Sequence, residues 1–131
     1  MSGISECAQS VLLAGLESLG SFERLPTVDM VNRFAFPAVE KHADAPGKIA
    51  RAVLAAFTQG VLEATCQSPE SESNAVIVSL VCDFVDDVRP GERIEAEVKV
   101  VRRTNSLIFL TADVTAGGRV LLTANALAKR P

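Results

Sequence analysis

Apolar residues recur at helical spacing close to the N-terminus of the chain. Gly20 follows them, at a position where glycine commonly ends a helix. The pattern predicts an amphipathic helix over Ile4–Leu19, within an N-terminal segment of residues 1–21. The apolar positions that define this helix are Ile4, Cys7, Val11, Leu12, Leu16 and Leu19.

The next segment, Thr27–Phe36 ("TVDMVNRFAF"), is rich in β-branched and aromatic residues. Its apolar residues alternate with the others, apart from Asn32, so the segment is predicted to be a first strand. The residues expected on its apolar face are Val28, Met30, Phe34 and Phe36. Pro37–Ala45 is predicted to be a loop.

A long apolar segment then predicts a central helix that opens at Pro46-Gly47 and runs to about Cys66. Proline suits the first turn of a helix, where its missing N–H would have no partner in any case. Polar residues form only a thin stripe, so most sides of this helix are expected to be covered. The stripe consists of Lys48, Arg51, Thr58, Gln59 and Glu63.

The second half of the chain changes to a two-residue period, which is typical of strands. Glycine-containing turns at Pro90-Gly91 and Gly117-Gly118 separate the runs, and such spacing predicts an antiparallel meander. A helix as apolar as the central one requires a sheet curled around it, which makes the predicted fold α+β. The four predicted strands are Ala75–Val85, Arg93–Arg102, Ser106–Thr115 and Val120–Lys129.

Length and composition narrow the possible functions. The chain has 131 residues, enough for one domain, and 48% of them are hydrophobic. A net charge of −3 and the absence of Trp and Tyr argue against a nucleic-acid partner. No basic residue precedes Arg24 and no run of 18 apolar residues occurs, so neither a secretory signal nor a membrane span is expected.

The cysteine and histidine content predicts no metal site. Cys7, Cys66 and Cys82 are odd in number and far apart, which favours reduced thiols in the cytoplasm over a disulfide framework. None of them has metal-ligand spacing, and the single histidine, His42, could not complete a usual zinc site.

The order of elements and several short motifs resemble the hotdog-fold thioesterase superfamily, in particular its phenylacetate-pathway-type acyl-CoA thioesterase branch. The resemblance covers residues 27–129, the expected hotdog core. It implies a curved antiparallel sheet wrapped around the central helix, here with an extra N-terminal helix, in one domain of residues 1–131. The motifs that carry it are Phe84, the turn Arg89-Pro90-Gly91, the alternating charged strand after it, the pair Arg102-Arg103, and the turn glycine before a last strand of small residues.

The start of the central helix departs from the family pattern. The family usually has His-Gly-Gly there, followed by an Asp or Glu seven residues after the second glycine. Counted from Ala45-Pro46-Gly47, that acid position is Leu54. Some branches use a Ser or Thr one turn beyond the acid, and Thr58 matches it. A hydratase or dehydratase relative, which often begins its helix with Pro-Gly, would have its acid at Ala52, so that chemistry lacks its acid as well.

Three further groups near this helix start are candidates for chemistry. The backbone N–H of Gly47 is expected at a helix N-terminus, where it could polarise a thioester carbonyl; the alternative is a plain helix start. His42 and Asp44 could supply the missing acid or base. The alternatives are a solvated loop residue for His42, a capping carboxylate for Asp44, and, for Thr58, a hydroxyl bonded back to its own helical turn.

The resemblance also implies how a ligand would be held. Arg89, Arg102 and Arg103 match positions where the family often contacts the phosphates of CoA, and guanidinium groups suit phosphate by geometry; ordinary strand-end charge is the alternative. The family implies a homodimer, often a dimer of dimers, with the acyl-CoA sites at the dimer interface. No cofactor is expected beyond CoA as part of the substrate.

These features predict a cytoplasmic thioesterase-like protein that hydrolyses or binds a thioester of CoA or acyl-carrier protein. With Leu54 at the acid position, hydrolysis is expected to be slow. The alternative is a binding or regulatory hotdog protein without hydrolysis, and a more distant one is a hydratase.

Overall fold

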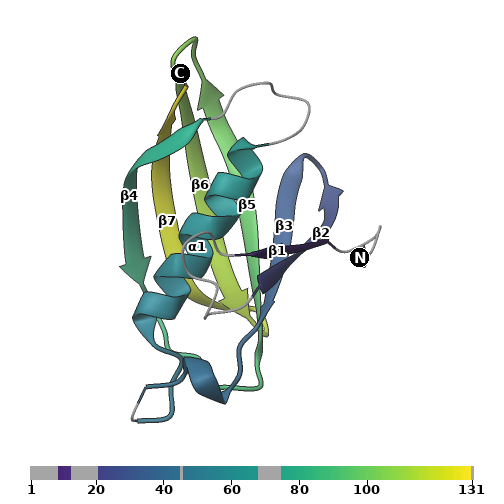
Figure 1. Ribbon diagram of the computed structural model, residues 1–131, viewed down its shortest axis with the longest axis vertical. Coiled ribbons are helices and arrows are strands. Elements are labelled where there is room, and N and C mark those ends of the chain that lie inside the picture. The colour runs from purple at the N-terminus through teal and green to yellow at the C-terminus, as the bar shows by residue number, and fades with distance from the viewer. Residues whose placement is uncertain (1–8, 13–20, 45, 68–74, 131) are drawn as a thin grey trace.

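The computed structural model describes residues 9–12, 21–44, 46–67 and 75–130. Its strands form one seven-stranded antiparallel sheet in the order β1-β2-β3-β5-β6-β7-β4, and the helix α1 lies across one face of this sheet (Figure 1). In chain order the elements are β1 (Gln9–Leu12), β2 (Ser21–Val28), β3 (Val31–Pro37), the 3₁₀ helix η2 (Glu40–His42), α1 (Arg51–Cys66), β4 (Val76–Phe84), β5 (Arg93–Arg103), β6 (Leu107–Ala116) and β7 (Arg119–Lys129).

The four strands after α1 confirm the predicted antiparallel strands, within a few residues at each end. β5, β6 and β7 form the predicted meander, but the prediction is wrong for β4, which pairs with β7 at the edge of the sheet and not with β5, the next strand in the chain. The curved sheet around a long helix is the hotdog fold, so the predicted α+β class is confirmed. The sheet includes β2 from Ser21, so it begins before the expected core boundary at residue 27.

The core lies between α1 and the concave face of the sheet. Four aromatic rings meet there. Phe22 and Phe34 from β2 and β3 have ring centroids 5.6 Å apart, and Phe57 of α1 lies 5.6 Å from Phe22 and 5.3 Å from Phe36. All four side chains are almost completely buried. Burying each ring contributes about 1.5–3 kcal/mol relative to exposure, so this cluster fixes the helix against the first strands.

The predicted N-terminal helix is wrong where the structure can test it. Gln9–Leu12 form the strand β1, whose residues pair in antiparallel register with Ser21–Arg24 of β2. A short apolar run such as Val11-Leu12 fits a strand as well as a helix, and the neighbouring strand offers hydrogen bonds that decide between them. The rest of Ile4–Leu19 lies outside the described residues.

The predicted single strand over Thr27–Phe36 is also wrong, because the chain reverses in its middle. β2 ends at Val28, a two-residue turn follows, and β3 begins at Val31. The turn residues Asp29 and Met30 have φ values of +50° and +64°, as a tight hairpin turn requires. Met30 is therefore 90% exposed at the tip rather than on a buried face.

The central helix begins later than predicted, although its end at Cys66 is confirmed. Arg51 is the first helical residue, and Pro46-Gly47 belongs to a separate turn closed by a bridge between Ala43 and Ile49. Within the described part of the chain, no helix has the length and apolar character needed to cross a membrane.

Candidate functional site

The N-terminal end of α1 presents open backbone donors. The N–H groups of Val53 and Leu54 both donate to the carbonyl oxygen of Ala50, at 2.9 and 3.2 Å. Among the described residues, no acceptor lies within hydrogen-bond distance of the N–H groups of Arg51 and Ala52. These two amides carry the positive end of the helix dipole, so they can donate to an oxygen of a bound molecule.

Gly47 does not lie at this helix end, and its expected role is wrong for that reason. Its N–H donates to the carbonyl oxygen of Asp44 at 3.0 Å, and its φ of +83° places it in a tight turn. The N–H of Lys48 donates to Oδ1 of Asp44 at 3.2 Å. The amide proposed to polarise a carbonyl is thus already engaged, and Asp44 acts as the cap of a turn, the simpler of its two interpretations.

His42 is buried rather than solvated. Its side chain is only 4% exposed, and its ring centroid lies 5.0 Å from that of Phe36. Nδ1 of His42 accepts the backbone N–H of Val39 at 3.0 Å, which makes Nε2 the protonated nitrogen of the neutral ring. Its carbonyl oxygen accepts the N–H of Ala50 at 3.0 Å. These contacts favour a role in holding the segment before α1 over a role in proton transfer.

Leu54 and Thr58 lie one turn apart on the buried side of α1, where they are 1% and 0% exposed. The Thr58 hydroxyl donates to the carbonyl oxygen of Leu54 at 2.8 Å, so it is bonded back to its own helix. The observed helix start also changes the count along the family motif. If Arg51 stands where the second glycine would be, the acid position seven residues later is Thr58, not Leu54.

Glu63, the carboxylate within α1, lies too far from the open N–H groups of Arg51 and Ala52 for all three to contact one bound group. Glu63 follows Arg51 by twelve positions, which at about 1.5 Å per residue is roughly 18 Å along the helix. Lys48 of the polar stripe pairs with a residue outside the helix, and its Nζ lies 3.1 Å from Oδ2 of Asp87.

Asp87 is the acidic residue near the helix start that the sequence reasoning missed. The hydrogen bond and charge of Lys48 lower the pKa of Asp87 below its usual value of 3.8, and Arg51 and Arg89 act in the same direction. Asp87 is therefore an ionised carboxylate at neutral pH. The acidic pair Asp86-Asp87 stands out in the sequence shortly before the turn Arg89-Pro90-Gly91, but nothing in the local sequence connects it to the helix start.

The three arginines predicted to bind phosphate do not lie together in the structure. Arg89 lines a hollow of ≈ 470 Å³ at the helix start, together with Lys48 and Asp87. Arg102 and Arg103 are the last two residues of β5, whereas Arg89 lies shortly before its first residue. At about 3.3 Å per residue, the two ends of this strand are roughly 30 Å apart.

The two neighbouring arginines also point to opposite faces of the sheet. Arg102 pairs with the partly exposed Phe109, whereas Arg103 pairs with Ile108, which is buried against the core. The register shift after Val100 decides which of the two arginines lies on the side of the core. Arg103 is close enough to α1 for its charge to act on the thiol of Cys66, whose pKa is nevertheless raised because burial dominates.

No group of three or more His, Cys, Asp or Glu side chains in the described segments is arranged to hold a metal ion.

The sequence matches the profile of the thioesterase superfamily over residues 49–123, more than half of the chain. The chain belongs to the thioesterase superfamily. The matched range begins just before α1 and ends within β7, so it contains the helix start described above. No curated protein matches the sequence.

Solved structures with low sequence identity share the fold of this thioesterase-superfamily member. The PaaI protein from the phenylacetic acid degradation operon of E. coli is 11% identical, with a TM-score of 0.79 over 90% of this chain and 84% of that one. Zebrafish thioesterase superfamily member 2 is 17% identical, with a TM-score of 0.76 over 84% and 81%. The smu.793 protein of Streptococcus mutans, solved with acetyl-CoA bound, is 11% identical, with a TM-score of 0.75 over 84% and 88%.

Proposed function

We propose that this protein binds an acyl thioester of CoA or acyl-carrier protein at the interface of a homodimer and hydrolyses it slowly. The observation that carries the proposal is the start of α1, where the amides of Arg51 and Ala52 are open while Leu54 and Thr58 are buried. Open amides at a helix N-terminus can bind and polarise a thioester carbonyl. Slow turnover follows because no carboxylate occupies the acid position to activate a nucleophile.

The side of α1 that the monomer leaves partly open suits an acyl chain. It carries small residues, among them the exposed Ala52 and the half-buried Ala55 and Ala56. At the edge of this surface, the Arg51 guanidinium lies over the ring of Phe84 on β4, 5.3 Å from its centroid. An apolar chain lying along α1 would bury this surface from water.

The β4 edge supports the homodimer. Among the described strands β4 pairs with β7 alone, and its other edge is the edge of the sheet. Val76, Val78 and Val81 on this strand are more than half exposed. An unprotected apolar edge tends to pair with another strand, and the same strand of a second copy is the matching partner for a two-fold interface. A tetramer built from two such dimers, and a location in the cytoplasm, stay predictions.

The relatives support a CoA thioester as the ligand. The smu.793 protein binds acetyl-CoA, and a hypothetical thioesterase from Streptococcus pneumoniae was solved with coenzyme A. For this chain the cationic groups Lys48, Arg51 and Arg89 near the helix start, and Arg103 at the far end of β5, are the candidates to meet the phosphates.

The test separates binding from hydrolysis. Isothermal titration with a non-hydrolysable acyl-CoA thioether measures binding, and release of free thiol from a panel of acyl-CoA and acyl-carrier-protein thioesters measures turnover. We expect saturable binding that weakens with added salt, together with slow thiol release. A protein that binds neither CoA nor carrier-protein thioesters would contradict the proposal.

A second comparison identifies the source of any turnover. Asp87→Asn removes the ionised carboxylate beside the helix start, and Asp44→Asn removes the turn cap. Asp113→Asn is the matched control, because Asp113 is exposed on β6 and lies outside this region. A loss confined to Asp87→Asn would make Asp87 the activating group, whereas wild-type turnover in all three variants would show that the activating group lies elsewhere.

The non-catalytic alternative has its own supporting observation, namely the buried leucine and the back-bonded threonine where the acid is expected. Binding without any detectable thiol release would favour it. The hydratase alternative has no such support, because it needs a histidine and an acid that converge on the ligand, whereas the ring of His42 packs on Phe36 and Asp44 caps its own turn.

A further inference from the structure

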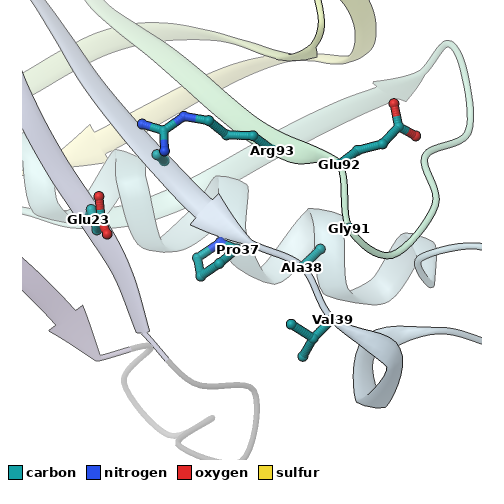
Figure 2. A pocket seen from close by; sticks show the side chains of 8 residues that line it. Glu23, Pro37, Ala38, Val39, Gly91, Glu92 and Arg93 are labelled. Atoms are coloured by element: carbon teal, nitrogen blue, oxygen red, sulfur yellow. The ribbon is translucent and has the colours of Figure 1, made fainter.

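A hollow of ≈ 290 Å³ lies on the face of the sheet opposite α1 (Figure 2). It exists because β3 presents two short side chains, Ala35 and Pro37, between longer ones. Ala35 pairs with Glu23 of β2 on one side and with Glu95 of β5 on the other, and Pro37 pairs with Arg93. Side chains of paired residues share a face, so the charged residues form walls and the two short residues form the floor.

The alternation along β3 places this hollow away from the thioester site. Phe34 and Phe36 turn into the core beneath α1, and Ala35 between them turns to the other face. Val39 closes the hollow at one end and is 47% exposed. The floor and this end are apolar, so they offer an apolar surface for a short hydrocarbon stem.

One carboxylate in the hollow lacks a countercharge among the described residues. Nε of Arg93 lies 2.8 Å from Glu95, and Glu92 lies 3.2 Å from Arg119, so both of these lining charges are neutralised by neighbours. No hydrogen bond or ion pair joins the side chain of Glu23 to the rest of the described chain. Glu23 is also half-buried, which reduces its contact with water and favours a cation beside it.

We propose that this hollow binds a primary ammonium group on a short aliphatic stem. The ammonium group pairs with Glu23, and the stem lies on the exposed side chains of Pro37 and Val39. An anionic molecule such as CoA is disfavoured there, because the lining charge without a countercharge among the described residues is the carboxylate of Glu23. The ligand is either a free alkylamine or the side chain of a lysine, which presents the same chemistry.

The experiment uses the whole chain labelled with ¹⁵N and follows its backbone amide signals. n-Butylammonium is the charged probe, 1-butanol is its neutral counterpart, and Nα-acetyl-lysine methylamide represents a lysine within a protein. We expect the signals of Ala35, Gly91 and Arg93 to shift on titration with the charged probes. 1-Butanol should bind at least about tenfold more weakly, because a charge-assisted contact is lost.

Two variants test the assignment of the charge. Glu23→Gln should weaken n-butylammonium binding about tenfold while leaving the amide signals outside the hollow unchanged. Glu97→Gln is the matched control and should bind as the wild type does, because Glu97 lies on the same face next to Arg33, outside this hollow.

The outcomes are distinct from those of the thioester experiments. Equal binding of butanol and n-butylammonium, undiminished binding by Glu23→Gln, or no saturable shift at the hollow would each overturn the proposal. Tighter binding of the lysine probe than of n-butylammonium would identify a protein side chain as the ligand, and the reverse order would identify a free amine. Neither result depends on whether acyl-CoA binds at α1.

Discussion

The side chains of Lys48 and Asp87 form an ion pair, with 3.1 Å between Nζ and Oδ2, that joins the turn before α1 to the loop after β4. Next to it, the N–H of Ile49 donates to the carbonyl oxygen of Val88 at 2.8 Å. Arg119 of β7 binds the same loop, with Nε 3.1 Å from Asp86 and Nη2 2.9 Å from the carbonyl oxygen of Asp87. The start of α1 is thus held by a charged network rather than by a side-chain helix cap.

The Lys48–Asp87 pair predicts a specific dependence of stability on pH. Because Lys48 lowers the pKa of Asp87 below 3.8, the pair stabilises the folded state above that value. This contribution is lost as the pH falls through the lower pKa of the folded state. Lys48→Ala should therefore lower the thermal unfolding midpoint at neutral pH, and the difference from wild type should disappear in acid below the folded-state pKa.

The control for this prediction is Lys99→Ala, which removes an exposed lysine of β5. Its unfolding midpoint should differ from wild type by a similar small amount in acid and at neutral pH. A Lys48→Ala deficit that persists unchanged in strong acid would show that Lys48 stabilises the protein by some means other than its pairing with Asp87.

Much of the sheet could be predicted because its pattern and its turns agree. Along β5 the buried residues Ile94, Ala96 and Val98 alternate with exposed or half-buried charged ones, so the faces of the residues before the register shift at Val100 follow from the sequence. Gly91 and Gly117-Gly118 have positive φ values, which glycine adopts without strain, so they mark the ends of strands correctly.

Two of the features that were missed, the turn between β2 and β3 and the start of α1, lacked such signals. The turn between β2 and β3 uses Asp29 and Met30 with positive φ and contains no glycine, so nothing in the local sequence interrupts the strand pattern. The helix start was misplaced because Pro46-Gly47 resembles a helix opening. The actual residue before the helix, Ala50, makes no side-chain cap. The hydrogen bonds from Ala50 to His42 and from Ile49 to Val88, together with the Lys48–Asp87 pair, fix its place.

The candidate site was predictable in outline and not in detail. The sequence predicted activity at the start of the central helix, and the open amides lie there, but on Arg51 and Ala52 rather than on Gly47. Asp87 could not be assigned to this site from the sequence, because it follows Lys48 by 39 positions. The two residues meet because the loop after β4 lies beside the turn before α1. Long-range pairings of this kind depend on the tertiary fold.

The strained turn at Met30 predicts a stabilising substitution. A side chain with a φ of +64° crowds its own backbone, at a cost of roughly 1 kcal/mol, and Asp-Gly is a preferred pair for a two-residue hairpin turn. Met30→Gly should raise the free energy of unfolding by up to about 1 kcal/mol, as measured by urea denaturation. Met30→Ala keeps the Cβ atom and should change it by less than about 0.5 kcal/mol. Equal effects of the two variants would argue that Met30 is not strained.

The opposite faces of Arg102 and Arg103 predict unequal effects on CoA binding. Arg103 lies on the side of α1, whereas Arg102 lies on the outer face with Phe109. Arg103→Ala should weaken binding of an acyl-CoA thioether by about tenfold, the loss expected for one charge-assisted contact, and should reduce its salt dependence. Arg102→Ala serves as the control with nearly unchanged affinity. The reverse order, measured by the same titration, would place the phosphates on the outer face.

The register of the catalytic motif on α1 can be tested by restoring a carboxylate. Leu54 is 1% exposed among the core residues, so Leu54→Asp should lower the free energy of unfolding by about 3 kcal/mol or more.

Thr58→Asp changes the side-chain size little. If the position of the family motif is counted from the observed helix start at Arg51, the variant Thr58→Asp should raise thiol release by at least about 10²-fold. Thr58→Asn is the control for size without charge, and it should stay as slow as wild type. If Thr58→Asp folds, binds acyl-CoA and remains as slow as Thr58→Asn, the acid position of the family is not at Thr58, and slow turnover would need an explanation other than the missing carboxylate.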